Sequence, residues 1–572
     1  MTLILRKGKS ISPGPVEKQL WTRPLDWLEM PAMSQGDEKI VFLAKIFEKG
    51  NNYFRFRITG DFQVDWGDGN TNTYTSLSDA EHSINWTDIS ASTLTSEGFR
   101  QAIITITPQS GSHMTVFNSR GTSPYHHPDD AYRGITNVNV ISCKIASTHF
   151  TSFYQGFWNA KGLHEFEYVG TNNVTSWSNA FYGCENLKKV NQLDLSNATN
   201  LNAMFKLCYS LIEIPSLNTS NATDITSMFE SCISIDYIPP IDISSSTTLN
   251  KTFSACNILA NNPISTGLAG ITNVDTAFAS CFKLTSFEAT MPNLSTVYRF
   301  FDGCTALQSV KLTVNSATLT SFRYVFRNCT SLQEIKSLDT SNVTNFDYAF
   351  SGLKIKDFTW IDFSSATSVA EMFTNSSIED ASWITLGSSL TNVKDMFFNC
   401  RKLVKGPASI DCTNVTNLQD LFSGCYMLKE LPTFTNTGSI TNMYGTFFQC
   451  RALTSIPLVT TNALTSFRAM VNGCYSLQSI PAFNLSGATA YPNGYQFAQS
   501  CFALTESNVT GATTQHSYIN CGMERTELVA MFNNLGTNTD GRTISVQANP
   551  GTAELTASDL AIATGKGWTV LT

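Results

Sequence analysis

The stretch MFKLCYSL at residues 204–211 contains the pattern that decides the fold: Phe, two spacers, Cys, two spacers, Leu. This pattern returns about every 24 residues over most of the chain. A fixed period in this range predicts a solenoid, because one coil cannot bury its apolar side alone and must stack on its neighbours. Clear copies are AFYGCENL at 180–187, MFESCISI at 228–235, VFRNCTSL at 325–332, LFSGCYML at 421–428 and TFFQCRAL at 446–453.

The residue types within one coil predict its local structure. In residues 224–250, the segment DITSMFESC begins with Asp224, a good helix cap, and suits one or two helical or 3₁₀ turns. The β-branched segment SIDYIPPIDI is typical of a short strand, and a Ser-Ser or Ser-Asn pair then turns the chain into the next coil. We therefore predict a long, narrow rod of about 14 coils over residues 135–520.

The 15 cysteines are explained by the same repeat. Most of them occupy one position per coil, and Leu353 holds that position in the coil of Phe350, which indicates a packing position for a reduced, buried thiol. No CxxC pair or Cys/His cluster has the spacing of metal ligands. The sequence therefore predicts neither a disulfide framework nor a metal or other cofactor.

The repeat resembles the BspA-like leucine-rich repeats. The segments SNATDITSMFESCISIDYIP at 220–239 and SNVTNFDYAF at 341–350 carry this resemblance. It implies a leucine-rich-repeat solenoid of the kind found in surface-displayed adhesion or interaction modules and in bacteriophage virion proteins. No catalytic residue comes with the family, so the resemblance favours a protein that is not an enzyme.

Residues 40–134 have the alternating pattern of an all-β sandwich, as in NYFRFRI at 52–58. The run VDWGDGNTNTY at 64–74 resembles the core strand and hairpin of PKD-like immunoglobulin-type domains. Trp66 would then pack between two sheets, and Asp68-Gly69 would form the turn. Part of a calcium loop is the alternative, but the regularly alternating oxygen ligands of such a loop are missing.

The C-terminal residues 521–572 are similar to the closing segment of many BspA-like arrays. A strand at residues 543–547 can pair with the last coil, and Ser558 can cap a short helix from Asp559 to Gly565. Such a segment would cover the exposed end of the stack. We predict a small α/β cap.

Residues 1–39 form an extended, proline-containing arm. Basic and aromatic side chains on such a segment suggest that it becomes ordered by docking on a larger assembly, and LRKGKSIS at 5–12 loosely resembles the openings of phage fibre proteins. Folding back onto the sandwich is the alternative. The candidate docking residues are Arg6, Lys7, Trp21, Trp27 and Leu28.

Composition limits the partners. Charged residues make up 14% of the chain and the net charge is −8, so no basic stripe for nucleic acid is present. No apolar run approaches the ~18 residues of a membrane span, and the opening lacks the apolar core of a signal peptide. A surface-binding solenoid of this kind suits a virion, because virions assemble in the host cytoplasm and leave by lysis.

Motifs for catalysis are missing. The pair His126-His127 beside Asp129 and Asp130 matches no hydrolase motif and suits a solvated turn between sandwich and solenoid. A glycan-degrading enzyme that brings together two carboxylates from different coils is the remaining alternative.

Two shortened coils mark a candidate binding surface. The coils of Phe350 and Phe373 lack the cysteine and place Trp360 and Trp383 at equivalent positions, where two outward indoles would form an aromatic shelf. Tyr324 and Tyr348 form a second matched pair. The alternative is that the indoles fill space left by the shorter coils.

These features together predict a non-enzymatic virion surface protein, a tail fibre or related appendage exposed on the particle. Its N-terminal arm would dock on other virion proteins, and its solenoid would attach to a host surface glycan or protein. Several copies, as in a homo-oligomer, would strengthen weak individual contacts. The alternatives are a decoration or connector protein of the virion and a bacterial cell-surface adhesin.

Overall fold

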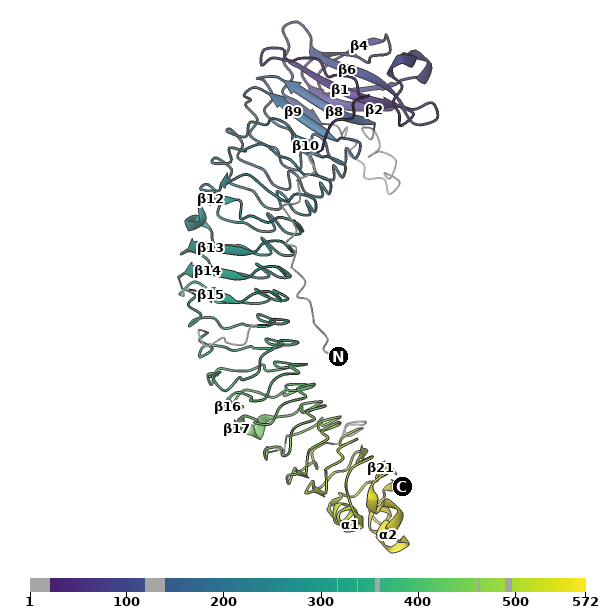
Figure 1. Ribbon diagram of the computed structural model, residues 1–572, viewed down its shortest axis with the longest axis vertical. Coiled ribbons are helices and arrows are strands. Elements are labelled where there is room, and N and C mark those ends of the chain that lie inside the picture. Colours follow the sequence, from purple (N-terminus) through teal and green to yellow (C-terminus); the bar gives the residue numbers. More distant parts are fainter. Residues whose placement is uncertain are drawn as a thin grey trace, which may run out of the picture.

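The computed structural model describes residues 21–118, 139–315, 317–336, 338–354, 361–460, 463–488 and 496–572. The molecule is a long, curved rod with a sheet-rich domain at the N-terminal end and two helices at the C-terminal end (Figure 1). Between them the chain winds into a leucine-rich-repeat solenoid of about 17 turns with about 24 residues each. The predicted fold class is therefore confirmed.

Most of the regular structure is short strand. The strands of the sandwich and the first coils are β1 (Lys39–Ile46), β2 (Tyr53–Thr59), β3 (Phe62–Asp65), β4 (Thr71–Tyr74), β5 (Asp79–Ser83), β6 (Arg100–Pro108), β7 (Val116–Asn118), β8 (Val140–Ala146), β9 (Glu165–Val169) and β10 (Lys189–Val190). The later strands are β11 (Ile241–Asp242), β12 (Ile264–Thr266), β13 (Ser286–Met291), β14 (Ser309–Val314), β15 (Glu334–Lys336), β16 (Ser409–Asp411), β17 (Thr433–Thr435), β18 (Ser479–Ile480), β19 (Glu506–Ser507), β20 (His516–Ser517), β21 (Thr543–Ser545) and β22 (Thr569–Leu571). The α-helices are α1 (Arg525–Asn534) and α2 (Ala557–Thr564).

The solenoid has more coils than the predicted fourteen because the repeat is disguised at both ends. The coil before the first clear copy has Phe157 at the Phe position and Ala160 in place of the cysteine. Its ring stacks on that of Phe181 with a centroid distance of 5.4 Å and an interplanar angle of 4°. At the other end, Tyr518 precedes Cys521 at the same spacing, and both are buried.

A continuous column of phenylalanine rings forms the centre of the rod. Neighbouring rings lie nearly parallel, with centroids 5.3 Å apart for Phe181 and Phe205 and 5.5 Å apart for Phe397 and Phe422. All of these rings are fully buried. Each coil therefore completes the apolar packing of the next, which makes the stability of one coil depend on its neighbours.

The cysteines line the same core, and all 15 are free and buried. Their position also has a polar function, because each thiol of the repeat donates a hydrogen bond to the carbonyl of the preceding coil's Phe position. The Sγ–O distance is 3.1 Å for Cys208 to Phe181 and 3.0 Å for Cys474 to Phe447. Burial raises the pKa of these thiols, to about 12 for Cys256, and keeps them protonated as donors.

The segment around each Phe is a run of turns, whereas its spacing predicted helical turns. Two residues per coil adopt left-handed backbone angles, as do Ser227 and Ser231 with φ of 57° and 66°. Alternate amides then point along the rod: Ser227 N donates to Asn250 O at 3.0 Å and Phe229 N to Thr252 O at 2.9 Å. A helical turn would keep these bonds within one coil, so the turn run gives the stack its inter-coil hydrogen bonds.

The N-terminal domain is a sandwich of a sheet with strand order β5-β2-β7 against part of a larger sheet. Trp66 is fully buried between them, with its ring 5.6 Å from that of Phe56. Asp68 lies in the β3–β4 hairpin, where it accepts hydrogen bonds from Asn70 N at 2.9 Å and interacts with His82 Nε2 at 2.7 Å. The hairpin turn therefore uses this carboxylate for its own structure.

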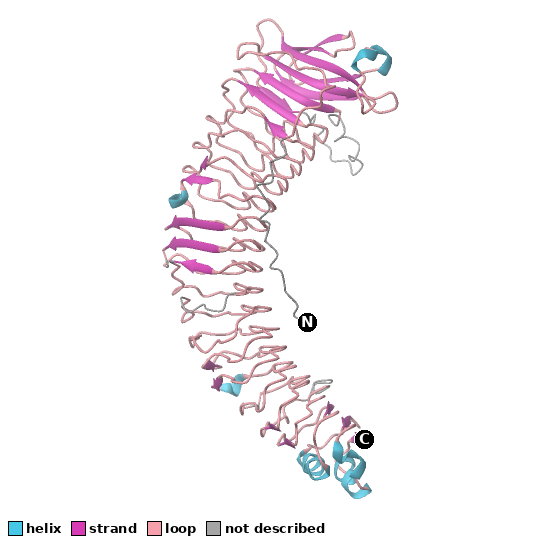
Figure 2. Ribbon diagram, viewed as in Figure 1, coloured by secondary structure: helices cyan, strands magenta, loops and turns pink. Residues whose placement is uncertain are grey.

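The sandwich continues directly into the solenoid. Its larger sheet has the order β10-β9-β8-β1-β6-β3-β4, so strands from both regions share one sheet (Figure 2). Strand β7 of the other sheet continues into the solenoid through a bridge from Val116 to Ser152. The apolar cores also merge, because Phe117 lies 5.1 Å from Phe157 between ring centroids. The sandwich thus closes the N-terminal end of the stack.

The C-terminal end is covered by α1 and α2 together with the parallel sheet β20-β21-β22. Thr556 caps α2 and forms a reciprocal capping box with Asp559, so the expected cap Ser558 lies inside the helix. The side chain of Asp559 also binds Arg525 of α1, with an Nε–Oδ2 distance of 2.9 Å. Within the described ranges, no helix is long and apolar enough to cross a membrane.

Candidate binding surface

The predicted tyrosine pair lies in the run of turns, just before the core Phe of each coil. Tyr324 and Tyr348 each precede a core Phe by two residues and have left-handed backbone angles, with φ of 60° and 58°. This geometry turns their side chains out of the core, and both are half-buried. Their rings stack with centroids 4.4 Å apart at an angle of 12°. The coil register therefore brings the two predicted residues together.

Arginines surround this pair. The guanidinium carbons of Arg299, Arg323 and Arg327 lie 4.9, 5.1 and 4.8 Å from the ring centroid of Tyr324. Carboxylates neutralise this cluster: Arg327 donates two hydrogen bonds to Asp302, at 2.8 and 2.6 Å. Carboxylates also lie near the other two, with Asp302 3.8 Å from Arg299 and Asp347 3.9 Å from Arg323. Two carboxylates therefore offset most of the charge of the three arginines.

The position two residues before the core Phe, which holds Tyr324 and Tyr348, carries acidic residues in the following coils. The Tyr348 hydroxyl donates a hydrogen bond to Glu371, and Asp395 and Asp420 occupy the next two equivalent positions. Burial, and then the neighbouring Asp420, raise the pKa of Asp395 to about 6. Burial also raises the pKa of Asp420. The described part of the chain contains no group of His, Cys, Asp or Glu side chains arranged to hold a metal ion.

Of the predicted indole shelf, the structure describes only Trp383. Trp383 is half-buried, its Nε1 donates to Asp380 O at 2.8 Å, and its ring lies 6.2 Å from that of the core residue Phe363. This position is one of packing against the coil. Trp360 lies outside the described residues, so the pairing of the two indoles stays a prediction.

A second surface was missed by the sequence interpretation: the position directly after the cysteine. We call this the post-cysteine column. Large apolar or aromatic side chains recur there and are exposed, with exposed fractions of 41% for Phe282, 38% for Tyr475 and 52% for Phe502. The repeat could have revealed this surface, because the residue directly follows a buried cysteine and begins the turn toward the strand. Its members include Tyr209, Ile233, Phe282, Arg401, Tyr426, Arg451, Tyr475 and Phe502.

The described part of the predicted docking arm folds back onto the sandwich. Trp27 is only 5% exposed and packs with Leu43, Phe99 and Ile141, and partly buried Trp21 and Leu28 pack against this cluster. These three docking candidates therefore anchor the arm to its own domain. Arg6 and Lys7 lie outside the described residues.

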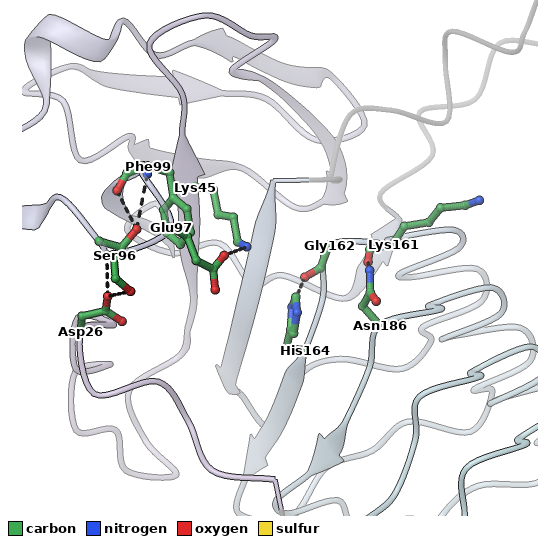
Figure 3. Close-up of polar contacts among 10 residues, drawn as sticks. Asp26, Lys45, Ser96, Glu97, Phe99, Lys161, Gly162, His164 and Asn186 are labelled. Atoms are coloured by element: carbon green, nitrogen blue, oxygen red, sulfur yellow. Dashed lines mark hydrogen bonds and ion pairs between the residues drawn. The ribbon is translucent and has the colours of Figure 1, made fainter.

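Polar contacts fix the arm in this position (Figure 3). Asp26 accepts hydrogen bonds from the backbone N and the Oγ of Ser96, both at 2.7 Å. Next to it, Lys45 Nζ lies 3.2 Å from Glu97 Oε2 and 5.9 Å from the ring centroid of Trp27. The contacts leave Trp27 no surface for an external partner.

Comparison with known proteins gives one family. The family model described as "Mycoplasma protein of unknown function, DUF285" matches residues 148–267, 295–405 and 391–505. The structure is similar to a leucine-rich repeat protein from Bacteroides ovatus, with 15% identity, 77% of this chain and 91% of the other covered, and a TM-score of 0.37. It is also similar to a leucine rich cell surface protein from Faecalibacterium prausnitzii, with 16% identity, coverage of 70% and 91%, and a TM-score of 0.27. No curated protein sequence matches the chain.

Proposed function

The chain belongs to the family described as "Mycoplasma protein of unknown function, DUF285", whose model matches more than half of it, and we propose that it is a non-catalytic attachment protein. Its solenoid would bind a partner surface with side chains repeated along the rod. The half-buried carboxylates Asp395 and Asp420 lie at the position that Tyr324 and Tyr348 hold in earlier coils, and we assign them a structural role.

The post-cysteine column is the observation that carries this proposal. The rings of Tyr475 and Phe502 contact each other, with centroids 4.9 Å apart and a tilt of 37°, while both remain exposed to solvent. Aromatic and arginine side chains dominate the binding energy of many protein surfaces. Aromatic side chains offer large contact areas with little conformational entropy to lose. Repetition along a rigid rod aligns several such contacts with one extended ligand.

We propose further that the protein is a virion surface component, a tail fibre or related appendage that attaches to the host. This finer proposal is supported by the resemblance of LRKGKSIS at 5–12 to phage fibre openings and by the phage virion proteins that use this repeat. Docking on the particle would then fall to residues 1–20, including Arg6 and Lys7. Weak contacts at each rod would be strengthened by several rods acting together.

Binding of fluorescently labelled full-length protein to whole candidate host cells tests the proposal. We expect saturable binding that falls at least about tenfold in the double variant Tyr475→Ser/Phe502→Ser, because both exposed rings lose their contact area. The matched control is Leu458→Ser, since Leu458 is 65% exposed elsewhere on the solenoid. Unchanged binding of the double variant would contradict the role of the column.

Antibody labelling of intact particles tests the finer proposal. A fibre or appendage predicts a few labels at a distal position. Labels spread over the whole capsid lattice would instead identify a decoration protein, and labels on the surface of uninfected cells would identify a cellular adhesin.

A further inference from the structure

The C-terminal half of the post-cysteine column forms an alternating ladder of arginine and aromatic side chains. The guanidinium carbon of Arg451 lies 4.1 Å from the ring centroid of Tyr426 and 5.2 Å from that of Tyr475. The guanidinium carbon of Arg401 lies 5.4 Å from the ring centroid of Tyr426, and the ring of Phe502 contacts that of Tyr475 at a tilt of 37°. We call these five residues the arginine–tyrosine ladder.

The ladder is built on a rigid backbone. The carbonyls of Tyr426, Arg451 and Tyr475 accept hydrogen bonds from the next coils, at 3.1 Å from Ala452 N and 3.2 Å from Ser476 N and Ala503 N. The cysteines that precede the ladder residues are fully buried in the core. A ligand would therefore meet side chains that are already in place, which lowers the entropy lost on binding.

Among the described residues, no carboxylate forms an ion pair with the arginines of this ladder. In the described part of the chain, the guanidinium groups of Arg401 and Arg451 make no ion pair or hydrogen bond, and Arg451 Nε is unpaired. The arginines around Tyr324 differ, because Asp302 and Asp347 lie near them.

The local sequence increases the contrast. No aspartate or glutamate occurs between Glu430 and Glu506, although the whole chain has a net charge of −8. Exposed Lys402 and Lys429 add positive charge beside the ladder. The stretch between these two glutamates, which holds Arg451, Tyr475 and Phe502, is therefore positively charged within an acidic molecule.

We propose that the arginine–tyrosine ladder binds an extended acidic polysaccharide; this inference rests on the attachment function proposed above and gives its ligand class. The planar guanidinium groups of Arg401 and Arg451 suit the carboxylates or phosphates of such a polymer, which they can bind with two parallel hydrogen bonds. The exposed faces of Tyr475 and Phe502 suit the apolar faces of sugar rings. Each acidic sugar of the ligand offers an anion and a ring face, which are the two groups that the arginines and the aromatic residues of the ladder can bind.

A nucleic acid offers the same two kinds of group but fits the surface less well. Binding of a nucleic-acid backbone requires neutralisation of many successive phosphates, and the overall charge of −8 opposes it. Two arginines with two neighbouring lysines supply too few cations for that neutralisation. Single-stranded DNA is therefore the competitor that the experiment includes.

Calorimetric titration of the full-length protein with polygalacturonate tests the inference. We expect binding that weakens as salt is added and that falls on the order of 100-fold in the double variant Arg401→Gln/Arg451→Gln, because two charge-assisted contacts are lost. The control Lys311→Gln/Lys336→Gln makes the same change in charge at exposed positions of β14 and β15, and its affinity should stay within about twofold. Thermal melts establish that both variants are folded. A parallel titration with a phosphate-bearing polymer, poly(glycerol phosphate), shows which anion the ladder prefers. Lowering the pH toward 3 distinguishes the two further, because carboxylates are neutralised before phosphate diesters.

The outcomes separate this inference from the attachment function. Equal affinity of the Arg401→Gln/Arg451→Gln variant and the original protein overturns the ladder, as does tighter binding of single-stranded DNA than of polygalacturonate. If host cells bind the protein but neither acidic polymer does, the ladder is overturned and attachment stands. If no candidate host cell binds the protein, the attachment function itself fails.

Discussion

At the scale of single residues, the repeat combines apolar filling with directed polar contacts. The cysteine position could be predicted from its period and from Leu353, which replaces it in one coil. Its hydrogen bond to the preceding Phe carbonyl could not be predicted, because that bond depends on the left-handed turn that places the carbonyl opposite the thiol. Cysteine is favoured over alanine here as a small apolar side chain that also carries a donor.

The column of half-buried acids leads to a prediction about pH. Burial and Asp420 raise the pKa of Asp395 to about 6, above the value of about 3.9 expected when unfolded. The folded state therefore holds this proton more tightly, and stability from this group declines as the pH rises from about 4 to 6. Asp395→Asn should raise the free energy of unfolding at pH 7.5 by about 1 kcal/mol after solvent screening, with little change at pH 4. Urea unfolding at both values checks this.

Asp380→Asn is the matched control. Hydrogen bonds from Ser382 lower the pKa of Asp380, so its stabilisation is present above about pH 4 and is lost as the pH falls. The control should destabilise the protein at pH 7.5. Equal effects of Asp395→Asn at both pH values would show that repulsion and burial of the carboxylate are not the cause.

At the scale of elements, strands and coils followed from the sequence more reliably than helices. The apolar spacing in DITSMFESC is shared by a helical turn and by the observed turn run, and only the bonds to the next coil distinguish them. In the cap, the strand β21 begins at the predicted Thr543, but the helix cap is Thr556, two residues before Ser558. Helix α1 was not predicted, since its apolar residues lack a strong cap signal.

The end of α1 gives the prediction at this scale. Lys566 Nζ donates hydrogen bonds to the carbonyls of Phe532, Asn533 and Leu535, at 3.3, 2.6 and 2.8 Å. A cation at this end also interacts favourably with the helix dipole. Lys566→Met should lower stability by about 1 kcal/mol and speed hydrogen exchange in residues 525–535.

Lys161→Met is its control, because Lys161 is exposed and forms a surface ion pair with Glu185. Unchanged exchange in α1 of the Lys566→Met variant would show that the three contacts do not hold the helix end. The Lys161→Met variant should show unchanged hydrogen exchange in α1.

At the scale of the whole molecule, the sequence predicted the rod and its ends but only part of the binding surface. Tyr324 and Tyr348 could be paired because the register fixes which residues stack. The post-cysteine column was missed because its exposure depends on the turn geometry, and the ladder alternates between two residue types. The sequence did not decide the position of Trp27, because docking on a larger assembly and folding back onto the sandwich would both bury its indole.

The shared sheet predicts what happens when the sandwich is removed. Strand β1 pairs with β8 over Lys39–Ala44, and Phe117 packs on Phe153 and Phe157 of the first coil. A protein beginning at Asn139 would expose this strand edge and these rings. We expect it to aggregate or to bind a hydrophobic dye during size-exclusion chromatography, because an uncovered solenoid end behaves as an open edge. A protein beginning at Trp21, which retains the sandwich, should elute as the full chain does. If the protein beginning at Asn139 is compact and does not bind the dye, the sandwich is not an end cap, and binding could then be studied on the solenoid alone instead of on point variants of the full chain.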